Sequence, residues 1–134
     1  MLTNADITIY NKVENKETRM LEWNRTVLKN VHSFITTKAE QMNNSARIAN
    51  EAVFRIPEEC SQYNDYLPEE LYYMCENKNI VWTAQTGDLI VNGICDLEIT
   101  GISTLEKNGV KPLRIASVND NRRGINPHIK VRCE

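Results

Sequence analysis

The strongest constraint on the fold is a repeated alternation of apolar and polar residues in short segments bounded by turn residues. The clearest case is "HIKVRC" near the end of the chain, where Ile129, Val131 and Cys133 alternate with polar residues. Successive side chains of a strand point to opposite faces of a sheet, so a period of two predicts a half-buried strand rather than a helix. The same pattern predicts strands in "DITIY", after which Asn11 begins a polar break, and in "PLRIASV".

Three segments in the middle of the chain also favour strands. "EWNRTVLKNVHSFITT" is rich in β-branched and aromatic residues and predicts one or two strands, over about 23–28 and 31–38. "AVFRIP" predicts a strand that ends at Pro57, which lacks a backbone donor. "IVWTAQTGDLIVNG" predicts two core strands joined by a turn at "TGD", with a glycine at each end of the second strand.

Helical signals are few and short. Residues 65–79 predict a surface helix, with Pro68 near its first position and acidic residues in its first turn. The apolar face of this helix is expected to contain Leu71, Met74 and Cys75. "STLEKNG" predicts a second helix of barely two turns, in which Ser103 and Glu106 have capping-box spacing and Gly109 takes a left-handed conformation at the end.

Residues 38–52 are the most ambiguous segment. Their Ala, Glu, Gln and Met residues favour helix, whereas "NNS" in the middle favours a loop. We expect a long exposed loop or ribbon. Taken together, the patterns predict a single mainly β domain over residues 1–134, a small barrel or sandwich with one or two short helices and long polar loops.

Charge and composition exclude some classes of protein. A net charge of −2 and a pI near 5.8 argue against a protein that coats nucleic acid. The first residues lack the features of a signal peptide, and no apolar run is long enough to span a membrane. We therefore expect synthesis in the host cytoplasm and no membrane contact.

No pattern in the chain predicts a metal, a cofactor or an enzymatic activity. The four cysteines have poor zinc spacing and are expected to be reduced and mostly buried; they are Cys60, Cys75, Cys95 and Cys133. Both histidines, His32 and His128, occur in strand-like alternation without a neighbouring nucleophile motif. The glycines of "TGDLIVNG" do not have the spacing of a phosphate-binding loop.

The segment "NDNRRGINP" predicts the polar tip of a hairpin between the last two strands. It places Asn121, Arg122, Arg123 and Gly124 in an exposed turn, with His128 at the start of the following strand. The arginines admit three interpretations: contacts to nucleic-acid phosphates, a protein interface, or a soluble loop. The sequence alone leaves all three open.

Four stretches carry a resemblance to a known group of proteins: "DITIYN", "RIP", "GDLIVNGICDLEIT" and "SVNDNRRGINPHIKV". In this order they resemble a family of small structural proteins, often called minor capsid proteins, from phages and prophages of Firmicutes. The resemblance covers most of the chain and is weakest at about 38–52. Such proteins are similar to the head-completion, or stopper, components of the tailed-phage neck.

This resemblance implies a non-enzymatic β-barrel in the virion neck, at the head-tail interface. The expected assembly is a homo-oligomeric ring with portal-adaptor proteins above it, tail-terminator or tail proteins below it, and packaged DNA passing non-specifically through its channel. The expected function is to close the packaged head and connect it to the tail. We expect the tip, Asn121–Gly124, and the segment of about 38–52 to make the contacts between rings.

Two alternatives remain at this level. A tail-terminator or tail-completion protein of the same neck would have similar size, charge and strand content. A nucleic-acid-binding β-barrel is the third possibility, although it would require a basic strand face with aromatic residues, which the sequence lacks.

Overall fold

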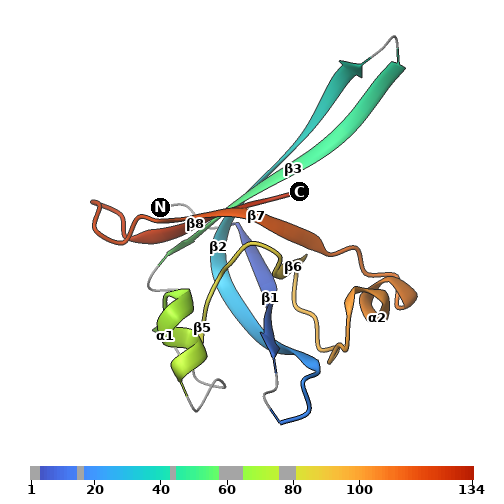
Figure 1. The fold of residues 1–134 in the computed structure, drawn as a ribbon. Coiled ribbons are helices and arrows are strands. Elements are labelled where there is room, and N and C mark those ends of the chain that lie inside the picture. The colour runs from blue at the N-terminus through green and yellow to red at the C-terminus, as the bar shows by residue number, and fades with distance from the viewer. Residues whose placement is uncertain (1–3, 15–16, 43–44, 58–64, 76–80) are drawn as a thin grey trace.

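Six antiparallel strands close into a barrel in the order β1-β2-β3-β8-β7-β6 (Figure 1). The structure is a computed structural model that describes residues 4–14, 17–42, 45–57, 65–75 and 81–134. The barrel strands are β1 (Ala5–Glu14), β2 (Leu21–Met42), β3 (Ser45–Pro57), β6 (Leu89–Asn92), β7 (Leu113–Asp120) and β8 (His128–Cys133). The remaining elements are β4 (Asp65–Tyr66) and β5 (Val81–Trp82), which pair in parallel, and the helices α1 (Glu69–Met74) and α2 (Ile102–Lys107). The predicted mainly β class is confirmed, and of the two architectures considered the barrel is correct.

Strand β2 changes partner along its length. Its first half pairs with β1, from Leu21 opposite Glu14 to Val31 opposite Ala5. Its second half pairs with β3, starting at His32. A bulge marks the change, because the register with β1 shifts there and Asn30 adopts a positive φ of 61°. An extra residue in one strand bends that strand and increases its twist, so the bulge directs the rest of β2 away from β1.

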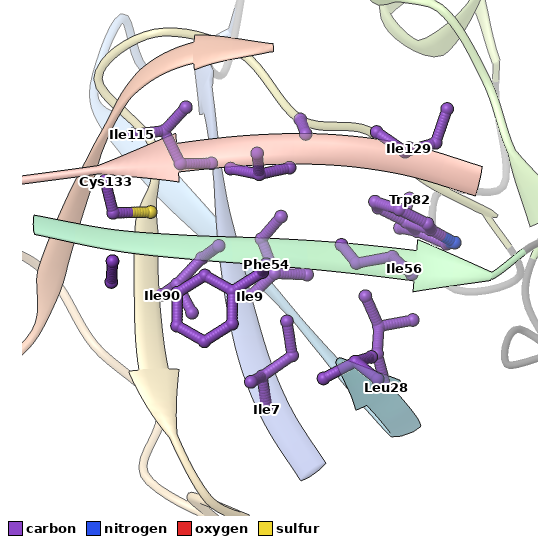
Figure 2. Close-up of a cluster of buried hydrophobic side chains, with 14 residues drawn as sticks. Ile7, Ile9, Leu28, Phe54, Ile56, Trp82, Ile90, Ile115, Ile129 and Cys133 are labelled. Carbon is purple, nitrogen blue, oxygen red and sulfur yellow. The ribbon is translucent and has the colours of Figure 1, made fainter. Parts of the chain in front are cut away.

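The interior of the barrel is filled by apolar side chains from all six strands. Figure 2 shows this cluster, in which Phe54 of β3 and Ile115 of β7 lie with Trp82, which β5 adds to the core. Of the residues on β8, Ile129, Val131 and Cys133 are the buried ones, as the period-two pattern predicted. The barrel is therefore a packed core rather than a channel.

Strand β1 is buried on both faces. Ile7 and Ile9 point into the barrel, whereas Tyr10 packs outside it in a second apolar cluster. Leu89 and Val91 of β6 and Leu105 of α2 belong to this outer cluster. The Tyr10 hydroxyl donates a hydrogen bond of 2.7 Å to the carbonyl of Leu97, which ties the segment before α2 to the barrel wall.

The segment that was ambiguous in sequence is a β-ribbon. Residues 36–42 of β2 pair with residues 45–51 of β3, and this two-stranded arm projects away from the barrel (Figure 1). The helical composition of the segment is overridden because each strand continues a strand of the barrel wall. We call residues 36–51 the arm.

Both helices differ in detail from the predictions. Within the described part of residues 65–79, helix α1 covers only Glu69–Met74; residues 76–79 lie outside the described chain. Its buried residue is Tyr72, whereas Leu71 and Met74 are exposed, so the predicted apolar face is wrong. In α2, the N-cap is Gly101 without a side-chain cap, so Ser103 forms no capping box. Gly109 has the predicted left-handed conformation, with φ of 76°.

The described cysteines are thiols. Cys95 and Cys133 are buried and Cys75 is partly buried, as expected, while Cys60 lies outside the described residues. Burial raises the pKa of the Cys133 thiol to about 12, so this side chain is an unreactive apolar group of the core.

The bulge provides a first prediction. A β-branched side chain in a left-handed conformation is strained, so we expect Asn30→Val to lower the free energy of unfolding by about 1–2 kcal/mol. Asn30→Gly is the matched control and should stay within about 0.5 kcal/mol of the wild type, since glycine adopts this conformation freely. Urea unfolding measures both variants. Equal destabilisation by the two would contradict the assigned backbone conformation.

Candidate functional site

The tip between β7 and β8 is held by its own polar side chains. The Arg122 guanidinium forms two hydrogen bonds to the Asp120 carboxylate, at 2.9 and 2.8 Å, and the backbone amide of Arg122 donates a third at 3.1 Å. The hydrogen bonds from Arg122 lower the pKa of the Asp120 carboxyl, so this pair stays charged at neutral pH. Two parallel hydrogen bonds fix orientation as well as distance, which makes the turn a defined shape.

A chain of ring contacts connects this tip to the barrel core. The Arg122 guanidinium lies 4.8 Å from the centre of the Tyr66 ring, a cation–π contact. Tyr66 in turn packs edge-on against Trp82, with 4.9 Å between ring centres. Because Trp82 belongs to the core of the barrel, the tip is braced against the most rigid part of the molecule.

Asn121 and His128 close the base of the tip. Their backbones exchange hydrogen bonds, and the Asn121 side-chain amide lies 3.3 Å from Nε2 of His128. Nδ1 of His128 lies 2.7 Å from the carbonyl of Asn126. Because a carbonyl oxygen only accepts, Nδ1 of His128 is the donor in the contact to Asn126. His128 therefore shapes the tip from within.

The predicted site residues thus divide into two groups. Asn121, Arg122 and His128 make contacts within the tip, and Arg122, which was expected to be exposed, is only partly exposed. Gly124 donates its amide to the Asn121 carbonyl. Arg123 is exposed, and sequence analysis missed Ile125, two residues further along the turn, whose side chain is fully exposed. A β-branched apolar residue in a polar turn was the available signal.

A groove lies between the beginning of β2 and the segment that precedes α2. Its volume is about 470 Å³, within the roughly 300–1,000 Å³ typical of binding pockets. Its lining combines apolar side chains, two acidic side chains and one arginine, and consists of Leu21, Glu22, Trp23, Asn24, Arg25, Glu98, Ile99 and Thr100. The Arg25 guanidinium donates to the Cys95 carbonyl at 3.0 Å, so part of its donor capacity is used. We call these eight residues the groove.

The groove exists because β2 is longer than the strands beside it. Among the described strands, the first half of β2 pairs only with β1, so its other edge has no neighbouring strand. Glu22 and Glu98 are both exposed at the rim, with Leu21 beside them. The groove therefore offers acidic groups next to apolar surface.

A buried carboxylate lies at the turn before β6. Asp88 has no exposed surface; its Oδ2 accepts from the Asn11 side chain at 2.9 Å and its Oδ1 from the Lys12 amide at 3.0 Å. Burial raises the pKa of Asp88 to about 6, and the hydrogen bonds from Lys12 and Asn11 limit the rise. A raised pKa often marks catalytic groups, but both oxygens of Asp88 face β1 and the side chain is closed off from solvent. We interpret Asp88 as a structural residue that fixes the turn before β6 to β1.

Asn11 extends this buried hydrogen-bond network. Its side chain donates to the Thr83 carbonyl at 2.5 Å and accepts from the Thr83 amide at 3.2 Å, which replaces a strand pairing. The sequence placed a polar break at Asn11, whereas the structure buries this residue inside β1, where it continues the inward row of Ile7 and Ile9.

The fold and these surfaces define a small closed β-barrel with a projecting arm and a braced hairpin tip. The chain belongs to a family of unknown function, DUF6751, which matches residues 2–134. No curated protein and no solved structure is significantly similar to it.

The described residues contain no group of three His, Cys, Asp or Glu side chains arranged to hold a metal ion. In the same part of the chain, neither helix has the length and apolar character needed to cross a membrane.

The buried carboxylate yields a second prediction, on stability against pH. Because folding raises the pKa of Asp88, the protonated form is favoured in the native state; this contribution to stability is complete below about pH 4 and is lost as the pH rises through about 6. Its size is roughly 3 kcal/mol. Asp88→Asn cannot titrate at this position. From pH 4 to pH 7 the free energy of unfolding of the wild type should therefore fall by about this amount relative to that of the variant.

Urea unfolding at several pH values measures this difference, and the titration of all other groups cancels in the comparison. A difference that stays constant over this range would show that Asp88 has an ordinary pKa in the native protein.

Proposed function

We propose that this chain is a structural subunit of a tailed-phage neck, a head-completion (stopper) protein whose ring closes the packaged head and joins it to the tail. The observation that carries the proposal is the arm. A two-stranded ribbon with no third strand or packed core is marginal on its own in water. An arm built as a continuation of two barrel strands is therefore best explained as a contact element for another molecule.

The backbone of the arm supports this interpretation. At the end of the β1–β2 sheet, the side chain of Asn4 accepts from the Ser33 amide at 2.8 Å and donates to the Ser33 carbonyl at 3.1 Å. Beyond Ser33, no strand in the described chain pairs with the outer edge of β2, and β3 pairs with β8 only from Ala52 onward. Open edges of this kind accept strands of a partner.

The base of the arm carries exposed apolar side chains. Phe34 is 56% exposed and Ile35 is 51% exposed, although they lie in the middle of a strand. By register, Ile35 lies opposite Ala52, which lies opposite the buried Cys133, so Ile35 extends a row of the barrel core onto the arm. Apolar surface in such a position favours burial by a neighbouring subunit.

The remaining properties agree with a neck component. A barrel filled with side chains serves as a rigid body that positions an arm and a tip. The net charge of −2 suits a ring through which DNA passes without binding tightly. In this proposal the arm contacts the adjacent ring, either the portal-adaptor proteins above or the tail-terminator or tail proteins below.

The proposal is tested by locating the chain in particles. Virions assembled with a tag at the carboxyl end of this chain are labelled with gold and imaged by electron microscopy. We expect a single narrow band of label just below the portal. Label at the upper end of the tail would instead identify a tail terminator. Absence of label from particles, together with salt-dependent DNA binding by the purified protein, would replace the proposal with a nucleic-acid-binding barrel.

Shortening the arm gives a further prediction. Replacing residues 37–50 by Asn-Gly joins Thr36 to Glu51, which are paired in the ladder, through a two-residue hairpin turn. The buried core lies outside the deleted segment, so the melting temperature should change by only a few degrees. Incorporation into particles should be lost.

The matched control is Asn44→Gly, which keeps the full arm. The amount of each variant in purified particles is measured by quantitative immunoblotting. Normal incorporation of the shortened variant would remove the arm from the proposal.

A further inference from the structure

We propose that the β7–β8 tip of one copy docks into the groove of the next copy, with Arg123 placed against Glu98 and Ile125 against the apolar wall. The inference rests on the proposed function, since it specifies the contact that would close the ring. It assigns the tip to neighbours within one ring, in place of the contacts between rings expected from the sequence, and leaves only the arm to contact the adjacent ring.

The tip is built to present two side chains. Asp120 and Arg122 neutralise each other through their paired hydrogen bonds, and this leaves Arg123 as the net charge of the turn. Arg123 is exposed, and Ile125 is 100% exposed. The bracing of Arg122 on Tyr66 fixes the turn before any partner arrives. A preordered loop loses little conformational entropy on binding, so a small contact can be effective.

The groove offers the complementary surface. Glu98 is exposed at the rim of the groove and offers a carboxylate to the Arg123 guanidinium of the tip. Leu21, which is 50% exposed, and the partly exposed Trp23 form the apolar wall that an isoleucine can contact. The volume of about 470 Å³ accommodates a turn carrying one isoleucine and one arginine. Paired opposite charges give such a contact its register, and the buried apolar area contributes affinity.

The position of the two surfaces identifies a second copy as the occupant. In Figure 1 the β7–β8 tip extends to one side of the barrel, while α2 and the segment before it lie on the other side. The tip therefore cannot enter the groove of its own chain. A contact between two different patches of identical subunits is heterologous, and it generates a closed ring when the rotation between neighbours closes.

The test uses charge reversal and its rescue in the full-length chain. Arg123→Glu places two carboxylates against each other, and Glu98→Arg places two guanidinium groups against each other. Because like charges repel, each variant alone should raise the apparent dissociation constant of self-association at least about tenfold. The double variant, Arg123→Glu with Glu98→Arg, restores opposite charges and should recover most of the wild-type affinity. A rescue of this kind distinguishes contact from damage to folding.

Analytical ultracentrifugation over a range of concentrations measures the association, with melting curves to verify that each variant is folded. Lys111→Glu and Glu70→Arg are the matched controls, because both residues are exposed and lie outside the tip and the groove. Both controls should associate like the wild type. Ile125→Ser should weaken association without changing its dependence on salt.

A ring that forms equally well with each of the single charge reversals would overturn the docking proposal, but it would not contradict the proposed role as a ring subunit. A wild-type chain that stays monomeric at all concentrations, with no oligomer trapped by a cross-linker between Ile125→Cys and Thr100→Cys, would also overturn it. The location of the label in virions then decides the proposed function separately.

Discussion

The length of β2 is the constraint on which the rest of the structure depends. With 22 residues it is more than twice as long as β1 and clearly longer than β3, so no single neighbouring strand can pair with its backbone along the whole length. At one end the excess produces the groove, because the edge of the first half has no neighbour among the described strands. At the other end it produces the arm. The bulge at Asn30 lets one strand serve both ends by bending where its partner changes.

The tip depends on the core in a different way. Its charged turn is stabilised locally by Asp120 and Arg122, but its orientation is set by the contact of Arg122 with Tyr66 and of Tyr66 with Trp82. Exposed ion pairs alone contribute little to stability. Here Arg122 of the pair also stacks on the Tyr66 ring, which packs against Trp82 of the core. These contacts give the polar turn a defined shape.

Sequence reasoning found what depends on local pattern. The β7–β8 hairpin, the burial of Ile129, Val131 and Cys133, and the turn at Gly109 follow from periodicity and from backbone preference alone. It missed what depends on partners that are distant in sequence. Asn11 was read as a break because an asparagine lowers strand propensity, yet Thr83 and Asp88 satisfy its amide inside the barrel.

The arm and α1 were undetermined in sequence for the same reason. Residues 38–52 have a composition that suits a helix, and only the pairing of β2 with β3 selects the strand. In α1, a six-residue helix has too few turns for periodicity to define its buried face, and the hydrogen bond from Asn24 to the Tyr72 hydroxyl marks which side faces the barrel. The groove was invisible because its two walls are more than 70 residues apart in sequence.

The separation of the arm from the tip and groove has a consequence for assembly. The arm projects beyond the barrel as a continuation of the wall strands β2 and β3, whereas the β7–β8 tip and the segment before α2, which lines the groove, lie on opposite flanks (Figure 1). In the proposed ring, contacts made by the flanks would repeat around the ring, and contacts made by the arm would lead out of it. Because the two sets share no residue, either can change without disturbing the other. A ring subunit that must fit both its own copies and an unrelated neighbour benefits from that independence, since distant sites contribute almost additively to binding.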